Sequence, residues 1–136
     1  PGRTSQVVGV VVLALFIVLS VMGIRDYFAW NTARWQAARY AMNELSCPPI
    51  HIDGGFEWGG WMNYDRFDEL PDFNHPGPVS WWWVREPRYV VAFVIPSGYH
   101  LVKAFPYHTP FSRRPRHVFL LKPVSPTATS PAASNR

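Results

Sequence analysis

The chain has 136 residues, a length that allows one membrane span and one small domain but not several large domains. Its formal net charge is +4 at pH 7, yet the basic residues are scattered and no RNA- or DNA-binding motif accompanies them, which argues against a nucleic-acid partner. The only cysteine, Cys47, excludes an internal disulfide, and no surrounding charge pattern favours a nucleophilic thiol.

The first predicted element is a charge-free apolar run from Val7 to Ile24, which Arg25 and Asp26 close. A run of this length, rich in Val, Leu and Ile, is near the short end of the range for a transmembrane helix. It shows no polar face, which disfavours a helix of a soluble domain. A cleaved signal peptide is the alternative, although its apolar core is typically ~7–15 residues long and a clear A-x-A cleavage site is missing. We therefore expect residues 1–25 to be a transmembrane segment.

Residues 26 to 45 continue with helical periodicity and predict an amphipathic helix that ends before Pro48-Pro49. Its predicted apolar stripe consists of Phe28, Trp35, Ala38, Met42 and Leu45, and its polar stripe of Thr32, Gln36, Arg39 and Asn43. Just beyond the apolar run lie Tyr27, Phe28 and Trp30. Aromatic rings favour the headgroup level of a bilayer, so these rings are expected either in an interfacial belt or in the core of the domain.

Basic residues follow the apolar run and recur near the C-terminal end. The two groups are Arg25, Arg34 and Arg39, and Arg113, Arg114 and Arg116. Anionic lipid headgroups are the partner that such groups favour next to a membrane span. Applied directly, the positive-inside rule would place this side of the span in the cytoplasm, because only Arg3 lies on the other side.

The most distinctive segment is residues 53 to 65, which crowds glycines, carboxylates and aromatic side chains together. Paired glycines allow positive φ or close approach of the backbone, so at least one glycine of this segment is expected to have positive φ. Flat aromatic rings next to carboxylates are typical of sugar-binding surfaces, with core packing as the alternative. The candidate binding residues of the segment are Asp53, Glu57, Trp58, Trp61, Tyr64 and Asp65.

The remaining elements are predicted to be strands and loops. Ile50 to Ile52 favours a short strand, residues 65 to 80 a loop, and Trp81 to Val84 a second strand. Alternation in that strand would point Trp82 opposite to its neighbours, so Trp82 is the last candidate binding residue unless both faces are covered. We expect lipid headgroups, a sugar or another part of the protein to contact an exposed ring there.

Farther along the chain, Tyr89 to Ile95 favours a strand, Ser97-Gly98 a tight turn and Tyr99 to Phe105 the hairpin partner. His117 to Leu121 favours a last strand. This pattern predicts an α+β fold, with one N-terminal transmembrane helix continuing into an amphipathic helix packed on a small antiparallel β-sheet. The expected divisions are a transmembrane segment over 1–25, a small α+β domain over 26–122 and a disordered tail over 123–136.

The motif IDGGFEWGGWMNYD, followed by Trp81-Trp82-Trp83, resembles the extracytoplasmic tail of bacterial multi-spanning glycosyltransferases of the aminoarabinose-transferase and protein-mannosyltransferase type. The resemblance extends from Val7 to about Lys122. It implies transfer of a sugar from a polyprenyl-phosphate donor and an extracytoplasmic position for the small domain. Relatives tend to have Asn where this chain has Gly59, so one amide side chain is missing from the motif. The catalytic acidic residue belongs to an early loop that has no counterpart here, so no residue of this chain is expected to be catalytic.

Other chemistry is poorly supported by the residues. Asp53, Glu57 and Asp65 could form a glycosidase-like carboxylate pair, but spacing alone is weak evidence for one, and we favour a ligand or loop contact or a structural role in a turn. No metal-ligand spacing, phosphate-binding loop or nucleophile motif is present, so no cofactor is expected.

Two hypotheses follow from these observations. The first is that the chain, which begins Pro1-Gly2 without an initiator Met, is the C-terminal span and accessory domain of a longer membrane glycosyltransferase. The second is a single-span, membrane-anchored module that binds glycan or an envelope polymer. The expected partners are membrane lipid, a lipid-linked sugar or glycan, and the remainder of a multi-spanning protein.

Overall fold

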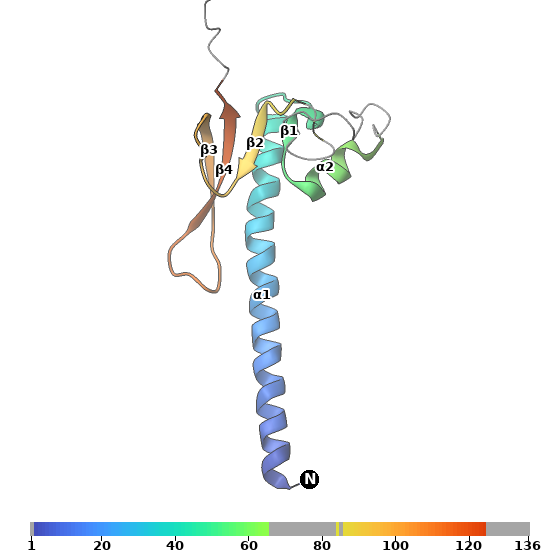
Figure 1. Ribbon diagram of the computed structural model, residues 1–136, viewed down its shortest axis with the longest axis vertical. Coiled ribbons are helices and arrows are strands. Elements are labelled where there is room, and N and C mark those ends of the chain that lie inside the picture. Colours follow the sequence, from blue (N-terminus) through green and yellow to red (C-terminus); the bar gives the residue numbers. More distant parts are fainter. Residues whose placement is uncertain (1, 66–83, 85, 125–136) are drawn as a thin grey trace, which may run out of the picture.

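A computed structural model of the protein describes residues 2–65, 84 and 86–124. Helix α1 (Arg3–Asn43) is one continuous helix of 41 residues. Its N-terminal half projects alone, and its C-terminal half is surrounded by the β-sheet on one side and helix α2 (Phe56–Asn63) on the other (Figure 1). The predicted boundary between residues 25 and 26 therefore falls inside one uninterrupted helix.

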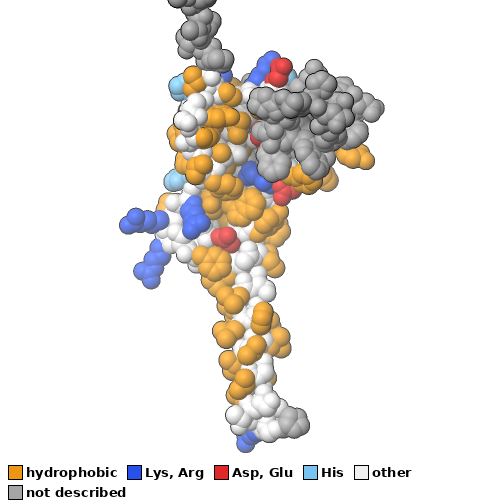
Figure 2. All heavy atoms as spheres, in the orientation of Figure 1, with side chains coloured by type: hydrophobic (Ala, Val, Ile, Leu, Met, Phe, Trp, Pro, Cys, Tyr) orange, Lys and Arg blue, Asp and Glu red, His pale blue; other side chains and the backbone are white. Residues whose placement is uncertain are grey.

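The N-terminal half of α1 is long and apolar enough to cross a membrane, with a mean hydropathy of 3.0 over its most apolar window. At a rise of 1.5 Å per residue, the run from Val7 to Ile24 measures about 27 Å, close to the ~30 Å hydrocarbon core of a bilayer. None of that window is buried by the described residues, and hydrophobic side chains project along its visible face (Figure 2). Within the described residues, this segment is therefore not packed as a core helix would be.

The C-terminal half of α1 is amphipathic, as predicted, and its polar stripe is exposed. The residues that it buries are small ones, Ala33, Ala37, Ala38 and Ala41. Of the predicted apolar stripe only Ala38 is fully buried, while Phe28 is 60% exposed. Alanines lie at the contact because they let the helix axis approach the sheet closely, so the larger apolar side chains pack around the edge of the contact.

The four-stranded sheet has the order β1-β2-β4-β3. Its strands are β1 (Ile52–Asp53), β2 (Tyr89–Ala92), β3 (Tyr99–Tyr107) and β4 (Arg116–Pro123). Strands β2 and β3 each pair with β4 in antiparallel register, whereas β1 pairs with β2 in parallel register. The fold class is α+β as predicted, but the sheet is mixed rather than purely antiparallel.

The hairpin predicted between Tyr89–Ile95 and Tyr99–Phe105 is wrong, because β4 lies between these two strands. Strand β4 buries Val118 and Leu120 toward α1, and it also buries Leu121 in its other face. A strand that is apolar on both faces is suited to the interior of a sheet rather than its edge. The Ser97-Gly98 turn itself is confirmed, with Gly98 at φ 85.

Other sequence predictions are met in part. Residues 50 and 51 of the predicted strand from Ile50 to Ile52 belong instead to a 3-10 turn over Pro49–His51. Strand β1 begins only at Ile52. Residues 66 to 80 of the predicted loop, Trp81 to Trp83 of the predicted second strand and the tail beyond Val124 lie outside the described residues. Val84 is buried but belongs to no strand.

The core lies between α1, α2 and the sheet. It joins the four buried alanines of α1 to Cys47, Ile52, Trp58, Val118 and Leu120. Trp58 of α2 packs edge-on against Trp35 of α1, with ring centroids 5.2 Å apart. Through this contact, the helix formed by the distinctive motif packs against the helix that contains the apolar run.

Candidate functional site

The motif at residues 53–65 folds as a tight turn followed by helix α2. Asp53 ends β1, is 4% exposed and accepts a hydrogen bond from the Gly55 N–H at 3.2 Å. Gly55 precedes the first residue of α2 with φ 90 and ψ 175, a backbone conformation that only glycine adopts readily. The prediction of a positive φ within the motif is therefore confirmed at Gly55, while Gly59 and Gly60 lie inside α2.

Because residues 56–63 are helical rather than extended, the candidate side chains point in different directions around α2. Trp58 is 1% exposed and belongs to the core. Trp61 is 80% exposed and Tyr64 is 72% exposed. Helical spacing of four and three residues places Glu57, Trp61 and Tyr64 on one side of the helix. We call this side the α2 face.

The remaining candidates are separated from the α2 face or cannot be placed. Asp53 is buried behind the turn and Asp65 is exposed just after α2. Trp82 lies outside the described residues, so its position relative to the α2 face is open. The glycosidase-like use of Asp53 with Glu57 is disfavoured, because a buried carboxylate that accepts a backbone N–H is occupied by its turn.

Glu57 is held by side chains from α1. Its carboxylate forms an ion pair with Arg34 and accepts a hydrogen bond from the Tyr27 hydroxyl at 3.3 Å. Arg34 also donates to the Asn31 side chain at 2.9 Å and stacks over the Trp30 ring at 5.0 Å from its centroid. These contacts fix α2 to α1 just beyond the end of the apolar run.

Two opposing effects act on the Glu57 carboxyl. Partial burial alone would raise its pKa, but a hydrogen bond from its own backbone N–H and the hydrogen bond and charge of Arg34 outweigh burial and lower the pKa below its ordinary value. Glu57 is therefore ionised at neutral pH. Its side chain is still 42% exposed, so these contacts do not enclose it.

Sequence reasoning missed the partners of Glu57. It assigned Arg34 to a group facing lipid headgroups and Tyr27 to an interfacial belt. A signal was present, because Tyr27, Asn31 and Arg34 follow one another at helical spacing and form a polar line beside the aromatic rings. The contact between Arg34 and Glu57 joins residues 23 positions apart in the sequence, and local periodicity does not reveal such a contact.

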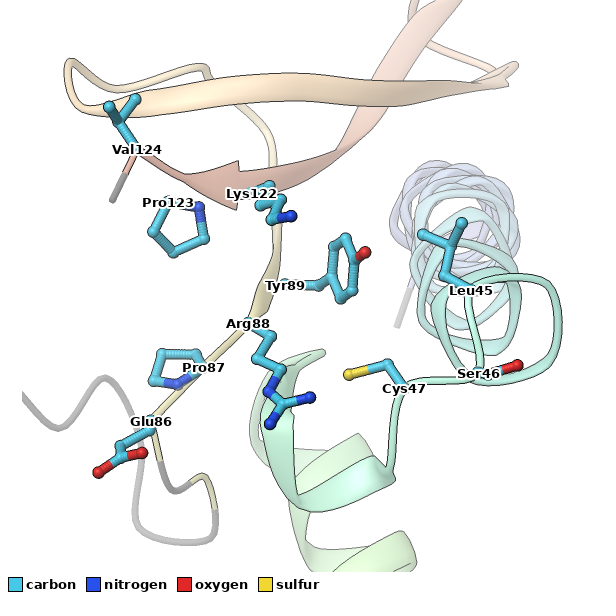
Figure 3. Close-up of a pocket in the computed structure, with 10 residues that line it drawn as sticks. All are labelled: Leu45, Ser46, Cys47, Glu86, Pro87, Arg88, Tyr89, Lys122, Pro123 and Val124. Atoms are coloured by element: carbon cyan, nitrogen blue, oxygen red, sulfur yellow. The ribbon is translucent and has the colours of Figure 1, made fainter. Parts of the chain in front are cut away.

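A hollow lies at the end of the sheet remote from the apolar run, with a volume of about 640 Å³. It is lined by residues that follow α1, precede β2 and end β4 (Figure 3). The Arg88 guanidinium points toward the Cys47 sulfur, whereas the Glu86 carboxylate points away (Figure 3). Burial raises the pKa of the Cys47 thiol although the nearby Arg88 charge opposes this, so Cys47 is a poor nucleophile at neutral pH.

Within the ranges 2–65, 84 and 86–124, no group of His, Cys, Asp and Glu side chains is arranged to hold a metal ion. Comparison with family models, with curated proteins and with solved structures found no match. The resemblance to membrane glycosyltransferases therefore stays a prediction from the motif.

Proposed function

We propose that this chain is a membrane span and accessory domain of a multi-spanning glycosyltransferase that takes its sugar from a polyprenyl-phosphate donor. The chain itself is non-catalytic in this proposal, and the reaction takes place on another part of the same protein. The motif resemblance motivates the proposal.

One structural observation supports it most strongly. The helix that carries the apolar run also holds the motif helix, through the contacts of Tyr27 and Arg34 with Glu57. Tyr27 and Arg34 lie three and ten residues beyond Ile24, which corresponds to about 5 and 15 Å along α1. If α1 spans the bilayer, the α2 face stands at or just outside the headgroups, where the sugar of a lipid-linked donor would lie.

The α2 face has the chemistry for a sugar. The exposed Trp61 and Tyr64 rings offer flat apolar surface to the C–H groups of a pyranose, and burial of such area contributes roughly 25 cal/mol per Å². Glu57 is kept ionised and oriented by Arg34 and Tyr27, so its carboxylate can accept charge-assisted hydrogen bonds from sugar hydroxyls.

Paired tryptophan variants of the complete membrane protein test this role. Trp61→Ala should lower sugar transfer at least tenfold, yet change the free energy of unfolding by less than about 0.5 kcal/mol, because the ring is 80% exposed. Trp58→Ala is the matched control, and it should destabilise by about 3–5 kcal/mol because it empties a buried site. Equal transfer by Trp61→Ala and the parent would overturn the sugar-contact role.

The genomic sequence upstream of Pro1 separates the two hypotheses. Further hydrophobic spans and an early acidic loop would support the glycosyltransferase. A start codon close to Gly2 would instead favour a single-span module that binds glycan or an envelope polymer through the same α2 face.

A further inference from the structure

The loop between β3 and β4, residues 108–115, reaches back along α1 toward its apolar half (Figure 1). Its first residues, His108, Thr109 and Pro110, line a hollow together with side chains of α1. The α1 residues in that hollow are Val21, Met22, Arg25 and Ala29. Counted along the helix, these positions extend about 6 Å to either side of Arg25. The loop is thus level with the end of the apolar run.

The loop has a defined shape. The Thr109 hydroxyl accepts a hydrogen bond from the Phe111 N–H at 3.0 Å, and the Ser112 hydroxyl donates to the Arg114 carbonyl at 3.0 Å. Thr109 is 6% exposed and anchors this turn against the domain. The anchored turn presents Phe111, which is 57% exposed, and the exposed arginines that follow it.

Basic residues predominate on this side of the molecule, where Asp26 is the acidic residue next to Arg25 on α1. Residues 106 to 117 contain no Asp or Glu. Among the described residues Arg34 forms an ion pair with Glu57, whereas Arg25, Arg113 and Arg114 form none with a carboxylate there. Figure 2 shows Lys and Arg side chains projecting where the domain meets the apolar half of α1.

We propose that the β3–β4 loop is a second membrane contact, in which Phe111 enters the headgroup region and Arg113 and Arg114 bind the phosphates of anionic phospholipids. This inference rests on the span assigned to α1 in the proposed function. The occupant is the leaflet from which α1 emerges, because an apolar ring and unpaired cations stand level with the end of the apolar run. Binding of an acidic protein would require neither a loop level with the end of the apolar run nor an exposed phenyl ring.

The test uses the full chain in a Cys47→Ala background, reconstituted in vesicles of phosphatidylcholine alone or with 30% phosphatidylglycerol. A fluorophore on Pro115→Cys, an exposed position beside Arg114, reports the loop, and one on His100→Cys, at the opposite end of β3, serves as the position control. We expect lipids with a quencher near the headgroup to quench the loop label in anionic vesicles but not the control label. A loop label that is equally open to aqueous iodide in both kinds of vesicle would overturn the proposal.

Charge variants sharpen the test. Arg113→Ala and Arg114→Ala should each shift the equilibrium between bound and free loop about fivefold toward the free loop. Arg88→Ala removes the same charge at the other end of the sheet and should leave the equilibrium unchanged. An equal effect of Arg88→Ala would show that only net charge matters and would contradict a site at the loop.

A third label separates this inference from the proposed function. A fluorophore on Leu15→Cys should be quenched by lipids that carry the quencher deep in the acyl chains. If Leu15 is quenched and the loop is not, the loop contact fails while the span stands. If Leu15 is not quenched, the span assignment and the proposed function fail together.

Discussion

Gly55 meets two requirements at once, and both concern the attachment of α2 to α1. Its φ of 90 lies in a region of backbone conformations that residues with a Cβ rarely adopt. A Cβ at this position would also lie 2.7 Å from Arg34 Nη1. Glycine is thus needed for the turn and for the close approach of the guanidinium that binds Glu57. The cost of backbone strain can be separated from the cost of moving Arg34, because Gly98 also has positive φ but has no side chain close to it.

We predict that Gly55→Ala destabilises the protein more than Gly98→Ala. Backbone strain of about 1–3 kcal/mol applies to both substitutions, but nothing lies within 4 Å of a Cβ at Gly98, whereas Arg34 must move at Gly55. Urea unfolding in detergent micelles gives both free energies. Equal losses would show that the Arg34 contact has no influence on the cost.

Glu57 gives a pH-dependent prediction. Its pKa is lowered in the folded protein from the ordinary 4.5, so the stabilisation is fully present above pH 4.5 and is lost as pH falls through the folded value. Because the group is substantially exposed, the contribution should stay below about 1 kcal/mol. The stability difference between the parent and Glu57→Gln should therefore be constant from pH 5 to 7 and shrink below pH 4.5. A difference that grows on acidification would contradict the ion pair.

At the scale of elements, the contact between α1 and the sheet depends on small side chains. Ala37 is fully buried, so Ala37→Leu should push the helix from the sheet and cost about 1–3 kcal/mol. The neighbouring Gln36 is exposed, and Gln36→Leu is the matched control that should change stability by less than about 0.5 kcal/mol. Thermal unfolding monitored by tryptophan fluorescence compares the two. A tolerated Ala37→Leu would mean that the interface has room for a larger side chain.

The sequence allowed the apolar run, the amphipathic continuation and the α+β class to be predicted, since each depends on local periodicity. The buried face of α1 was misjudged because large apolar residues were counted, although Ala33, Ala37 and Ala41 recur at every fourth position. The order of the strands could not be derived locally. The central place of β4 depends on pairing with two strands, one of them distant along the chain.

For the motif too, one feature could be predicted locally and another depended on tertiary contacts. Its composition indicated a strained glycine, which is found, but not a helix, because Gly59 and Gly60 each lower helix stability by about 1 kcal/mol relative to Ala. Burial of Trp58 against Trp35 offsets that cost. Tertiary packing therefore decided both the form of the motif and the direction in which each candidate side chain points.

At the scale of the whole molecule, the continuity of α1 couples the domain to the orientation of its N-terminal half. The sheet and α2 flank the helix on opposite sides (Figure 1). A contact of the β3–β4 loop with headgroups on one side would hold the α2 face at a constant height on the other. Under the proposed function, a rigid helical connection would keep the α2 face at the height of a lipid-linked sugar better than a flexible linker would.

The side of the membrane on which the domain lies is subject to two opposing arguments. Basic residues after the apolar run favour the cytoplasm by the positive-inside rule. The proposed function, through the family resemblance that motivates it, instead implies the extracytoplasmic side. We expect the extracytoplasmic side, because preceding spans of a multi-spanning protein would determine the topology.

A membrane-impermeant maleimide should therefore label His100→Cys in spheroplasts before lysis. The parent chain is the control, since its Cys47 is buried and burial raises the pKa of that thiol. Labelling of His100→Cys only after lysis would place the domain in the cytoplasm and remove the basis for a lipid-linked sugar on the α2 face.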